Sequence, residues 1–229
     1  MVQEYLGALA AEMGRYKDQE YVVKTLYIGG GTPTILGPNQ LEETISSVYQ
    51  NFHVVPGAEF TVEANPGTLT EDKTRVLKDL GVNRISLGLQ AYQTTLLKTL
   101  GRLHSPKDFE KSFRLLRQRG FSNINADIMF GLPGQGLKDF DESLEKLLLL
   151  DPDHISCYSL IIEEGTKFYQ LYQEGKLKLP TEDDERTMYH RAIDYLSHRA
   201  YQHYEISSFA KEGKRSLHNL TYWKCDDYL

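Results

Sequence analysis

Polar residues and a run of glycines stand where several apolar segments of this chain end. The stretch Thr25–Ile28 leads directly into Gly29-Gly30-Gly31-Thr32, and Glu63, Gln90 and Asp127 stand at the ends of three later segments. Backbone without Cβ atoms lets a ligand approach closely. A carboxylate can accept hydrogen bonds from an ammonium or from both hydroxyls of a ribose. Together these groups suit a ligand that is both an amino acid and a nucleoside.

Each of these residues also has an interpretation that needs no ligand. A glycine run after a strand is often only a tight turn, and this run matches neither the dinucleotide-binding nor the P-loop pattern. Glu63 could cap a helix or pair with a neighbouring lysine, and Gln90 could be a solvated amide in a loop. Asp127 is harder to explain in this way, because a carboxylate inside the apolar stretch Ile124–Phe130 must find hydrogen-bond partners.

Alternating strands and helices are expected to position these residues, judged by apolar periodicity and by capping residues. The predicted strands are Thr25–Ile28, Glu59–Glu63, Arg84–Leu89, Asn123–Met129, His154–Leu160 and His203–Ile206. The predicted helices are Val2–Met13, Gln40–Tyr49 with Asn39 as its cap, Thr70–Leu80 begun by a threonine cap and closed by Gly81, Lys107–Arg119 ended by Gly120, Asp139–Leu149 and Thr181–Arg199.

Strands joined by helical crossovers imply an α/β fold with a parallel sheet and right-handed connections. Five or six such units favour a closed or partly closed barrel, and a doubly wound open sheet is the alternative. Both folds bind ligands at the carboxyl ends of their strands. We therefore expect the glycine run, Glu63, Gln90, Asp127 and also Tyr158 to converge at one edge.

Composition limits the classes of function. The 229 residues, 40% of them hydrophobic, can bury a core as one domain or form most of a larger one. A net charge of −6 leaves no basic stripe for nucleic acid. No apolar run reaches the roughly 18–20 residues that span a bilayer, so no transmembrane segment is expected. The first residues carry no secretory signal pattern, and a cytoplasmic location is the default expectation.

The two cysteines, Cys157 and Cys225, are far apart in the sequence. Their spacing provides neither a disulfide framework nor a zinc site, so free thiols in a reducing compartment are expected. An iron–sulfur cluster needs several closely spaced thiolates, and this sequence does not supply them.

Six ordered motifs resemble those of a known family. They are Gly29-Gly-Gly-Thr-Pro-Thr34, Val62-Glu-Ala-Asn-Pro66, Ile85-Ser-Leu-Gly-Leu-Gln90, Asp127-Ile-Met-Phe-Gly-Leu-Pro133, Tyr204-Glu-Ile-Ser-Ser-Phe-Ala210 and His218-Asn-Leu-Thr-Tyr-Trp223. In this order they resemble radical S-adenosylmethionine (radical SAM) proteins of the oxygen-independent coproporphyrinogen III oxidase family. The resemblance covers nearly the whole chain. The HNxxYW ending is more similar to the haem chaperone (HemW-type) branch than to the oxidases.

The resemblance implies a partial, TIM-like radical SAM barrel over residues 1–200 and the start of a C-terminal region over 201–229. On it, a first S-adenosylmethionine would be held by Glu63 and the loop residues Gly30, Gly31 and Thr32. A second molecule would meet Gln90, Arg102 and Asp127, with Ile161 in a weaker backbone or packing role. Arg102 has the chemistry to bind a carboxylate through two charge-assisted bonds. Without the resemblance, a surface salt bridge is the simpler role for Arg102.

His218 carries the expectation specific to the haem chaperone branch. A neutral imidazole can ligate haem iron, and Tyr222 and Trp223 offer aromatic surface for a porphyrin. The alternative is a solvated loop histidine followed by packing aromatics. The remaining histidines lack a ligand-like grouping and are expected to be ordinary surface or core residues.

The sequence also departs from the family pattern. The family holds a [4Fe-4S] cluster on a CxxxCxxC loop after its first barrel strand, and this chain contains neither that loop nor that strand. It also stops before a glycine-rich segment, and it has Ser208 where the branch usually has Asn. We expect a truncated chain that cannot hold the cluster or cleave S-adenosylmethionine reductively, and that binds S-adenosylmethionine weakly.

Two functions remain, from different classes. The first is a haem chaperone-like protein that binds haem and S-adenosylmethionine and delivers haem to an acceptor protein of unknown identity. The alternative is an oxygen-independent coproporphyrinogen III oxidase, which decarboxylates propionate side chains. The HNxxYW ending favours the chaperone. A binding module that has lost both activities is a third, simpler possibility.

Overall fold

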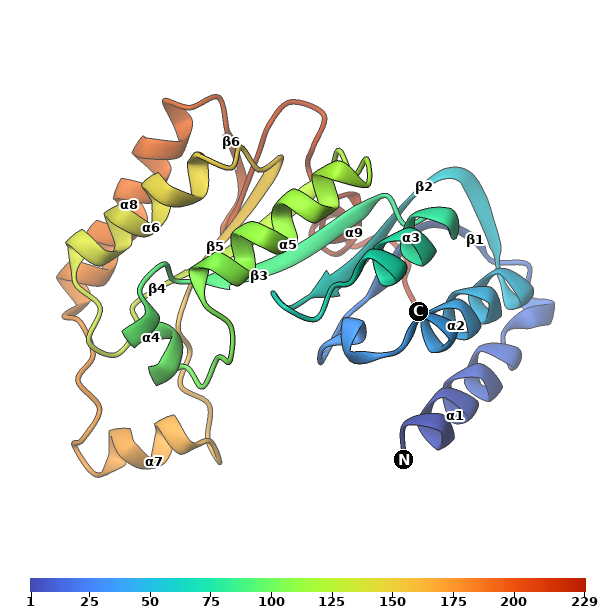
Figure 1. Cartoon of the computed structure of the whole chain (residues 1–229), viewed down its shortest axis with the longest axis horizontal. Helices are drawn as coiled ribbons and strands as arrows, with labels where there is room; N and C mark the ends of the chain where they lie inside the picture. The colour runs from blue at the N-terminus through green and yellow to red at the C-terminus, as the bar shows by residue number, and fades with distance from the viewer.

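Seven strands form one curled sheet in the computed structural model, which describes residues 1–229 (Figure 1). Their order across the sheet is β1-β2-β3-β4-β5-β7-β6. The first five run parallel, and β7 is antiparallel to both β5 and β6. The strands are β1 (Val22–Ile28), β2 (His53–Ala64), β3 (Arg84–Gln90), β4 (Ile124–Phe130), β5 (His154–Ser159), β6 (Gln202–Glu205) and β7 (Ser208–Ala210).

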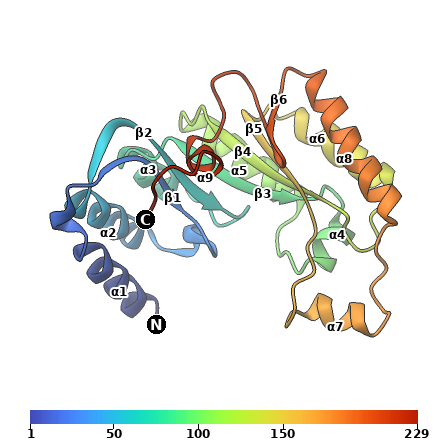
Figure 2. The same ribbon diagram turned by 180° about the vertical axis from the view of Figure 1, so that it is seen from behind.

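The helices are distributed unequally over the two faces of the sheet (Figures 1 and 2). The convex face is covered by α2 (Pro38–Asn51), α3 (Glu71–Asp79), α5 (Pro106–Gln118), α6 (Leu137–Leu148) and α8 (Glu182–Ser197). Outside this layer lie α1 (Val2–Gly14), which packs on α2, and α4 (Thr94–Thr99) and α7 (Lys167–Gln173). The short helix α9 (Leu217–Trp223) lies on the concave face. Two 3₁₀ turns cover Lys17–Gln19 and Pro33–Ile35.

This arrangement confirms the predicted partial barrel. A doubly wound sheet would carry its crossover helices on both faces, whereas here they share one face. The sheet stays open, with β1 at one edge and β6 at the other.

The apolar core lies between the sheet and the helices of the convex face. Alternate strand residues such as Val62, Ile85, Ile124 and Ile155 are completely buried there. Since successive side chains of a strand point to opposite faces, the residues between them point to the concave side. These are largely polar. The apolar side fixes the register of the strands, and the polar side leaves groups available for chemistry.

Several local predictions from the sequence are confirmed. The Thr70 hydroxyl accepts the Lys73 amide at 3.2 Å and caps α3. Gly81 and Gly120 follow α3 and α5 with φ values of 87° and 80°, a left-handed conformation that glycine adopts without strain. The predicted Asn39 cap of α2 is wrong. That helix begins earlier, at Pro38, because proline is preorganised for the first helical turn. Gly37 is its cap, and the Gly37 amide donates to Gln40 Oε1 at 3.0 Å.

The end of the sheet differs from the expected parallel arrangement. The single strand predicted over His203–Ile206 is instead β6, which turns back into the three-residue β7. Strand β7 inserts beside β5 in the antiparallel direction, so the sheet is mixed. A three-residue strand is too short for apolar periodicity to reveal. The short helices α7 and α9 were also not predicted.

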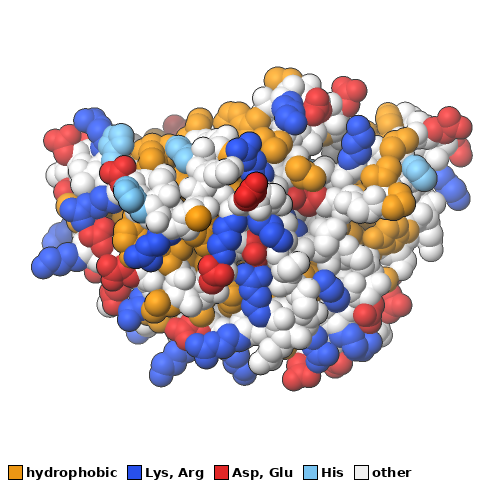
Figure 3. All heavy atoms as spheres, turned by 90° about the horizontal axis from the view of Figure 1, so that it is seen from above, with side chains coloured by type: hydrophobic (Ala, Val, Ile, Leu, Met, Phe, Trp, Pro, Cys, Tyr) orange, Lys and Arg blue, Asp and Glu red, His pale blue; other side chains and the backbone are white.

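The surface mixes both signs of charge. Figure 3 shows acidic side chains interspersed among Lys and Arg on the face it presents. Several lysine and arginine side chains bind other groups of the protein. Lys78 donates to the Gly120 carbonyl at 2.9 Å, and Arg117 forms an ion pair with Asp153 at 2.6 Å. None of the helices combines the length and the apolar character that a bilayer span requires.

Candidate functional site at the carboxyl ends of the strands

Glu63 and the glycine loop meet at the carboxyl ends of β1 and β2. Glu63 Oε2 accepts the Gly30 amide at 3.2 Å, and Glu63 Oε1 accepts the Tyr27 hydroxyl at 2.8 Å. Gly30 has a φ of 101°, and nothing lies within 4 Å of where a Cβ of Gly30 or Gly31 would be. The loop therefore presents open backbone beside a partly buried carboxylate that is tied to the protein by neutral donors.

A second set of contacts joins the loop to Arg102. Asn65 Nδ2 donates to the Thr32 hydroxyl at 2.7 Å, and Asn65 Oδ1 accepts from Arg102 at 3.3 Å. The Arg102 guanidinium is partly buried and contacts this amide rather than an acidic side chain. Its charge is thus available to an anionic ligand at this edge.

Gln90 ends β3 in an unusual backbone conformation. Its φ is 69°, and the pairing of β3 with β4 shifts register between Gly88 and Gln90. A non-glycine residue in the left-handed region costs free energy, on the order of 1–3 kcal/mol, and such residues concentrate at functional sites. The Gln90 side chain is 3% exposed, so it is not a solvated loop amide. Its Oε1 accepts the Tyr158 hydroxyl at 3.2 Å.

Asp127 is held inside the concave face by neutral donors. Asn125 Nδ2 donates to its carboxylate at 2.7 Å, and the Ser86 hydroxyl does so at 3.2 Å. Burial raises the pKa of the Asp127 carboxyl, and the bonds from Asn125 and Ser86 oppose that rise. The hydrogen-bond partners expected for this residue are present.

The structure brings the candidate residues to one edge of the sheet. Burial raises the pKa of the Tyr158 hydroxyl, and the charges of Asp127 and Glu63 add to the rise while Arg102 opposes it. One hydroxyl thus lies in the field of all three side chains, although they come from different parts of the chain. Ile161 lies just beyond β5 and is 74% exposed.

Sequence reasoning missed Tyr27, Asn65, Ser86 and Asn125, which hold the candidate residues. Asn65 and Ser86 lie inside quoted motifs, so their positions were visible but their roles were not. One signal could have found Tyr27 and Asn125. Each is a polar residue two positions before a candidate, Tyr27 before the glycine loop and Asn125 before Asp127, and residues two apart lie on the same face of a strand.

His218 lies on the concave face, on α9 and not in a loop. Its ring stacks on that of Tyr27 with centroids 5.1 Å apart and an interplanar angle of 26°. Nδ1 is 3.0 Å from the Thr25 hydroxyl, and Nε2 is 3.2 Å from the Tyr222 hydroxyl. Burial lowers the pKa of the His218 imidazole, which favours its neutral form. Tyr222 and Trp223 remain about half exposed beside it, at 46% and 54%.

The other histidines and the cysteines form no metal site. His104 and His154 are buried, and His53, His190, His198 and His203 are exposed. Cys157 is buried, which raises the pKa of its thiol, and Cys225 is exposed. No three His, Cys, Asp or Glu side chains are grouped so that they could hold a metal ion.

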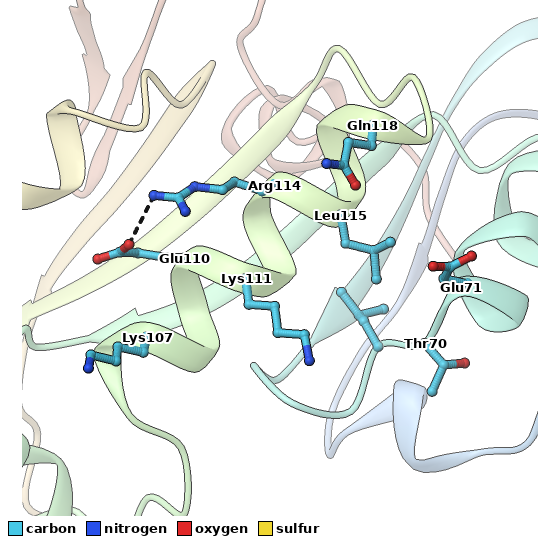
Figure 4. Close-up of a pocket in the computed structure, with 9 residues that line it drawn as sticks. Thr70, Glu71, Lys107, Glu110, Lys111, Arg114, Leu115 and Gln118 are labelled. Atoms are coloured by element: carbon cyan, nitrogen blue, oxygen red, sulfur yellow. Dashed lines mark hydrogen bonds and ion pairs between the residues drawn. The ribbon is translucent and has the colours of Figure 1, made fainter.

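A hollow of about 750 Å³ lies elsewhere, outside the barrel between α3 and α5 (Figure 4). Its lining is mostly charged, and two of its members, Glu110 and Arg114, form an ion pair at 3.1 Å. It contains none of the candidate residues. The lining residues are Leu69, Thr70, Glu71, Lys107, Glu110, Lys111, Arg114, Leu115 and Gln118.

The sequence of this chain is similar to those of known proteins. The chain is 45% identical to the protein named heme chaperone HemW of Bacillus subtilis, over all of this chain and 61% of that protein. It is 39% identical to the HemW of Lactococcus lactis, over 99% of this chain and 59% of that protein. The chain therefore spans about 60% of the length of these curated relatives.

Solved structures give the same fold. The coproporphyrinogen III oxidase HemN of Escherichia coli, described as a radical SAM enzyme, superposes with a TM-score of 0.83 at 24% identity. The match covers 97% of this chain and 51% of that one. A sequence model described as the radical SAM superfamily matches residues 4–147, more than half of the chain. The open glycine loop, the carboxylate-lined strand ends and these matches show that the chain belongs to the radical SAM superfamily.

Proposed function

We propose that this chain forms the haem-binding and S-adenosylmethionine-binding part of a haem chaperone. The observation that carries the proposal is the position of His218, on the concave face of the barrel beside two half-exposed aromatic side chains. Relatives that match the whole of this chain at 39–45% identity are named heme chaperone. The same C-terminal segment is the one whose HNxxYW pattern resembles the chaperone branch.

The residues around His218 suit a porphyrin. An imidazole ligates iron through a nitrogen lone pair, so it must be neutral, and burial of His218 favours that form. Its Nε2 has one hydrogen-bond partner, the hydroxyl of the half-exposed Tyr222. A metal at Nε2 therefore displaces one exposed hydroxyl, while the Thr25 contact at Nδ1 keeps the ring oriented. Trp223 adds exposed aromatic surface for the macrocycle.

The strand-end site suits S-adenosylmethionine. Glu63 offers a carboxylate for the methionyl ammonium, and the open backbone at Gly30 and Gly31 lets the ligand lie against the loop. For a second molecule, Arg102 offers a cation to the methionyl carboxylate, and Gln90 and Asp127 offer acceptors to hydroxyl or amino groups. A [4Fe-4S] cluster would supply electrons to this chemistry. The two cysteines of this chain are not grouped to hold one, so we expect binding without reductive cleavage.

A haem titration tests the proposal. Haem added to the chain should give an absorption band of histidine-ligated iron, and His218→Ala should lose it. His190→Ala is the matched control, since His190 is exposed on α8, away from the concave face. A His218→Ala variant that keeps the band would contradict the assignment. Glu63→Gln should weaken S-adenosylmethionine binding in calorimetry and leave the haem band in place.

The same preparations test the alternative. Release of carbon dioxide from coproporphyrinogen III would indicate the oxidase. The likeness to the solved oxidase is at 24% identity and concerns the fold, so it does not favour that activity over haem binding.

A further inference from the structure

Tyr27 touches both candidate binding sites. At one end its hydroxyl donates to Glu63 Oε1 at 2.8 Å. At the other end its ring stacks on His218. Burial, and then the charge of Glu63, raise the pKa of the Tyr27 hydroxyl, so it stays protonated and remains a donor. The strand-end carboxylate and the histidine of α9 are therefore joined through one side chain.

Tyr27 and Glu63 both pack closely against Gly29. A Cβ added to Gly29 would lie 2.6 Å from Tyr27 Cε1 and 2.8 Å from Glu63 Cδ. Both distances are far below van der Waals contact, so a side chain at position 29 would have to displace Tyr27 or Glu63. Because the Tyr27 hydroxyl donates to Glu63, a shift of the Glu63 carboxylate toward a ligand must be followed by Tyr27 or break their hydrogen bond.

His218 is tied to the same two strands that carry Tyr27 and Glu63. Its Nδ1 contacts Thr25, two residues before Tyr27 on the same face of β1. Its amide donates to Glu59 Oε1 at 2.9 Å, and Glu59 lies four residues before Glu63 on β2. The Glu59 bond to the backbone fixes the helix position, whereas the Thr25 contact and the Tyr27 stack both act on the orientation of the imidazole.

We infer that Tyr27 is a positioning residue that couples ligand occupancy at Glu63 to the orientation of His218. An ammonium at Glu63 competes with the Tyr27 hydroxyl for the carboxylate. Once released, the Tyr27 ring holds the imidazole less firmly. The His218 Nε2 can then exchange its contact with the Tyr222 hydroxyl for a bond to iron more easily. The coupling thus has a sign: S-adenosylmethionine strengthens haem binding. This inference rests on the proposed function for its two ligands, whereas the relay itself consists of contacts within the chain.

Linked titrations test the coupling. In the wild type, saturating S-adenosylmethionine should tighten haem binding by about fivefold or more. By reciprocity, haem should tighten S-adenosylmethionine binding by the same factor. Tyr27→Phe keeps the ring and removes the hydroxyl, so both ligands should bind with no effect on each other. Tyr201→Phe is the matched control, because it removes a buried hydroxyl that donates to Pro152 instead, and it should keep the wild-type coupling.

Two results would overturn the inference: a wild type that binds both ligands independently, or a Tyr27→Phe variant with undiminished coupling. A wild type that binds no haem would instead refute the proposed function. The contact relay through Tyr27 can then be tested without either ligand. Glu63→Gln weakens the bond to Tyr27 and should shift the ring resonances of His218 in nuclear magnetic resonance spectra. In a Tyr27→Phe background the same substitution should leave them in place. Equal shifts in both backgrounds would exclude the relay.

Discussion

Substitution of Glu59 is the most direct test of how helix α9 is held against the sheet. Glu59 is 6% exposed on β2, and its carboxylate accepts the Leu217 amide at 3.0 Å, the His218 amide at 2.9 Å and the Ser216 hydroxyl at 3.4 Å. These donors form the first turn of α9, where the helix dipole favours a negative charge. Glu59→Gln keeps the shape but removes the charge, and it turns one acceptor into a donor that faces the helix amides.

The expected cost follows from those contacts. Hydrogen bonds to a charged group contribute about 1.5–3 kcal/mol each, and one of the two amide bonds survives on the remaining oxygen. Adding the lost interaction with the helix N-terminus, we expect the docking of α9 to weaken by about 2–3 kcal/mol. This corresponds to a roughly 30- to 150-fold larger population of the open helix, and to amide exchange that is faster by the same factor.

Hydrogen exchange at the Leu220 and Lys224 amides measures that opening. Both bonds lie in or at the end of α9, to the carbonyls of Ser216 and Leu220, so they report on the helix without involving Glu59. Glu43→Gln on α2 is the control, because Glu43 is exposed and does not contact α9. Exchange that changes less than about threefold, under 1 kcal/mol, would refute the reasoning.

Three further predictions use the same structure. Gly29→Ala should destabilise the chain by about 1–3 kcal/mol, since its Cβ would meet Tyr27 and Glu63; urea unfolding measures this, and an equally stable variant would contradict the packing. Burial lowers the pKa of His154 well below its usual value of 6.5. The unfolded chain therefore takes up this proton before the folded protein does. The contribution of His154 to the unfolding free energy is fully present above pH 6.5 and is lost below it by about 1.4 kcal/mol per pH unit. His154→Gln should flatten this pH dependence between pH 7 and 5.5, and an unchanged slope would refute the prediction. Anaerobic reconstitution with iron and sulfide should leave these 229 residues without iron–sulfur absorbance, and a stable cluster would overturn that expectation.

The parts of the fold that follow from local patterns could be predicted from the sequence. Apolar stretches gave the central strands, and Thr70, Gly81 and Gly120 marked helix ends because their roles depend only on nearby residues. The ends of β1–β5 meet at one edge of any parallel sheet, so the meeting of Glu63 and Asp127 there could be expected as well.

Features that depend on long-range contacts could not be predicted. The left-handed backbone of Gln90 arises from a register shift against β4, and a single strand's sequence does not show its neighbour. Likewise, His218 follows several basic residues and looks solvated in sequence. Its contacts with Thr25 and Tyr27 come from almost two hundred residues earlier in the chain.

The order of α9 needs such distant contacts. It has seven residues, none of them buried, and isolated helices of that length are unstable in water. Glu59 holds its first turn from one side. From another side, the Tyr204 hydroxyl accepts the Ser216 amide at 3.1 Å and bonds to His154 at 2.8 Å.

The second set of contacts also leads back to the strand-end site. His154 lies 2.6 Å from Asn125, and Asn125 donates to Asp127. Both candidate carboxylates are thus linked to the segment that carries His218. Glu63 is linked to it through Tyr27, and Asp127 is linked to it through Asn125, His154 and Tyr204. A polar concave face of this kind costs stability compared with an apolar barrel interior. It places the histidine where changes at the strand ends can reach it through hydrogen bonds and ring contacts.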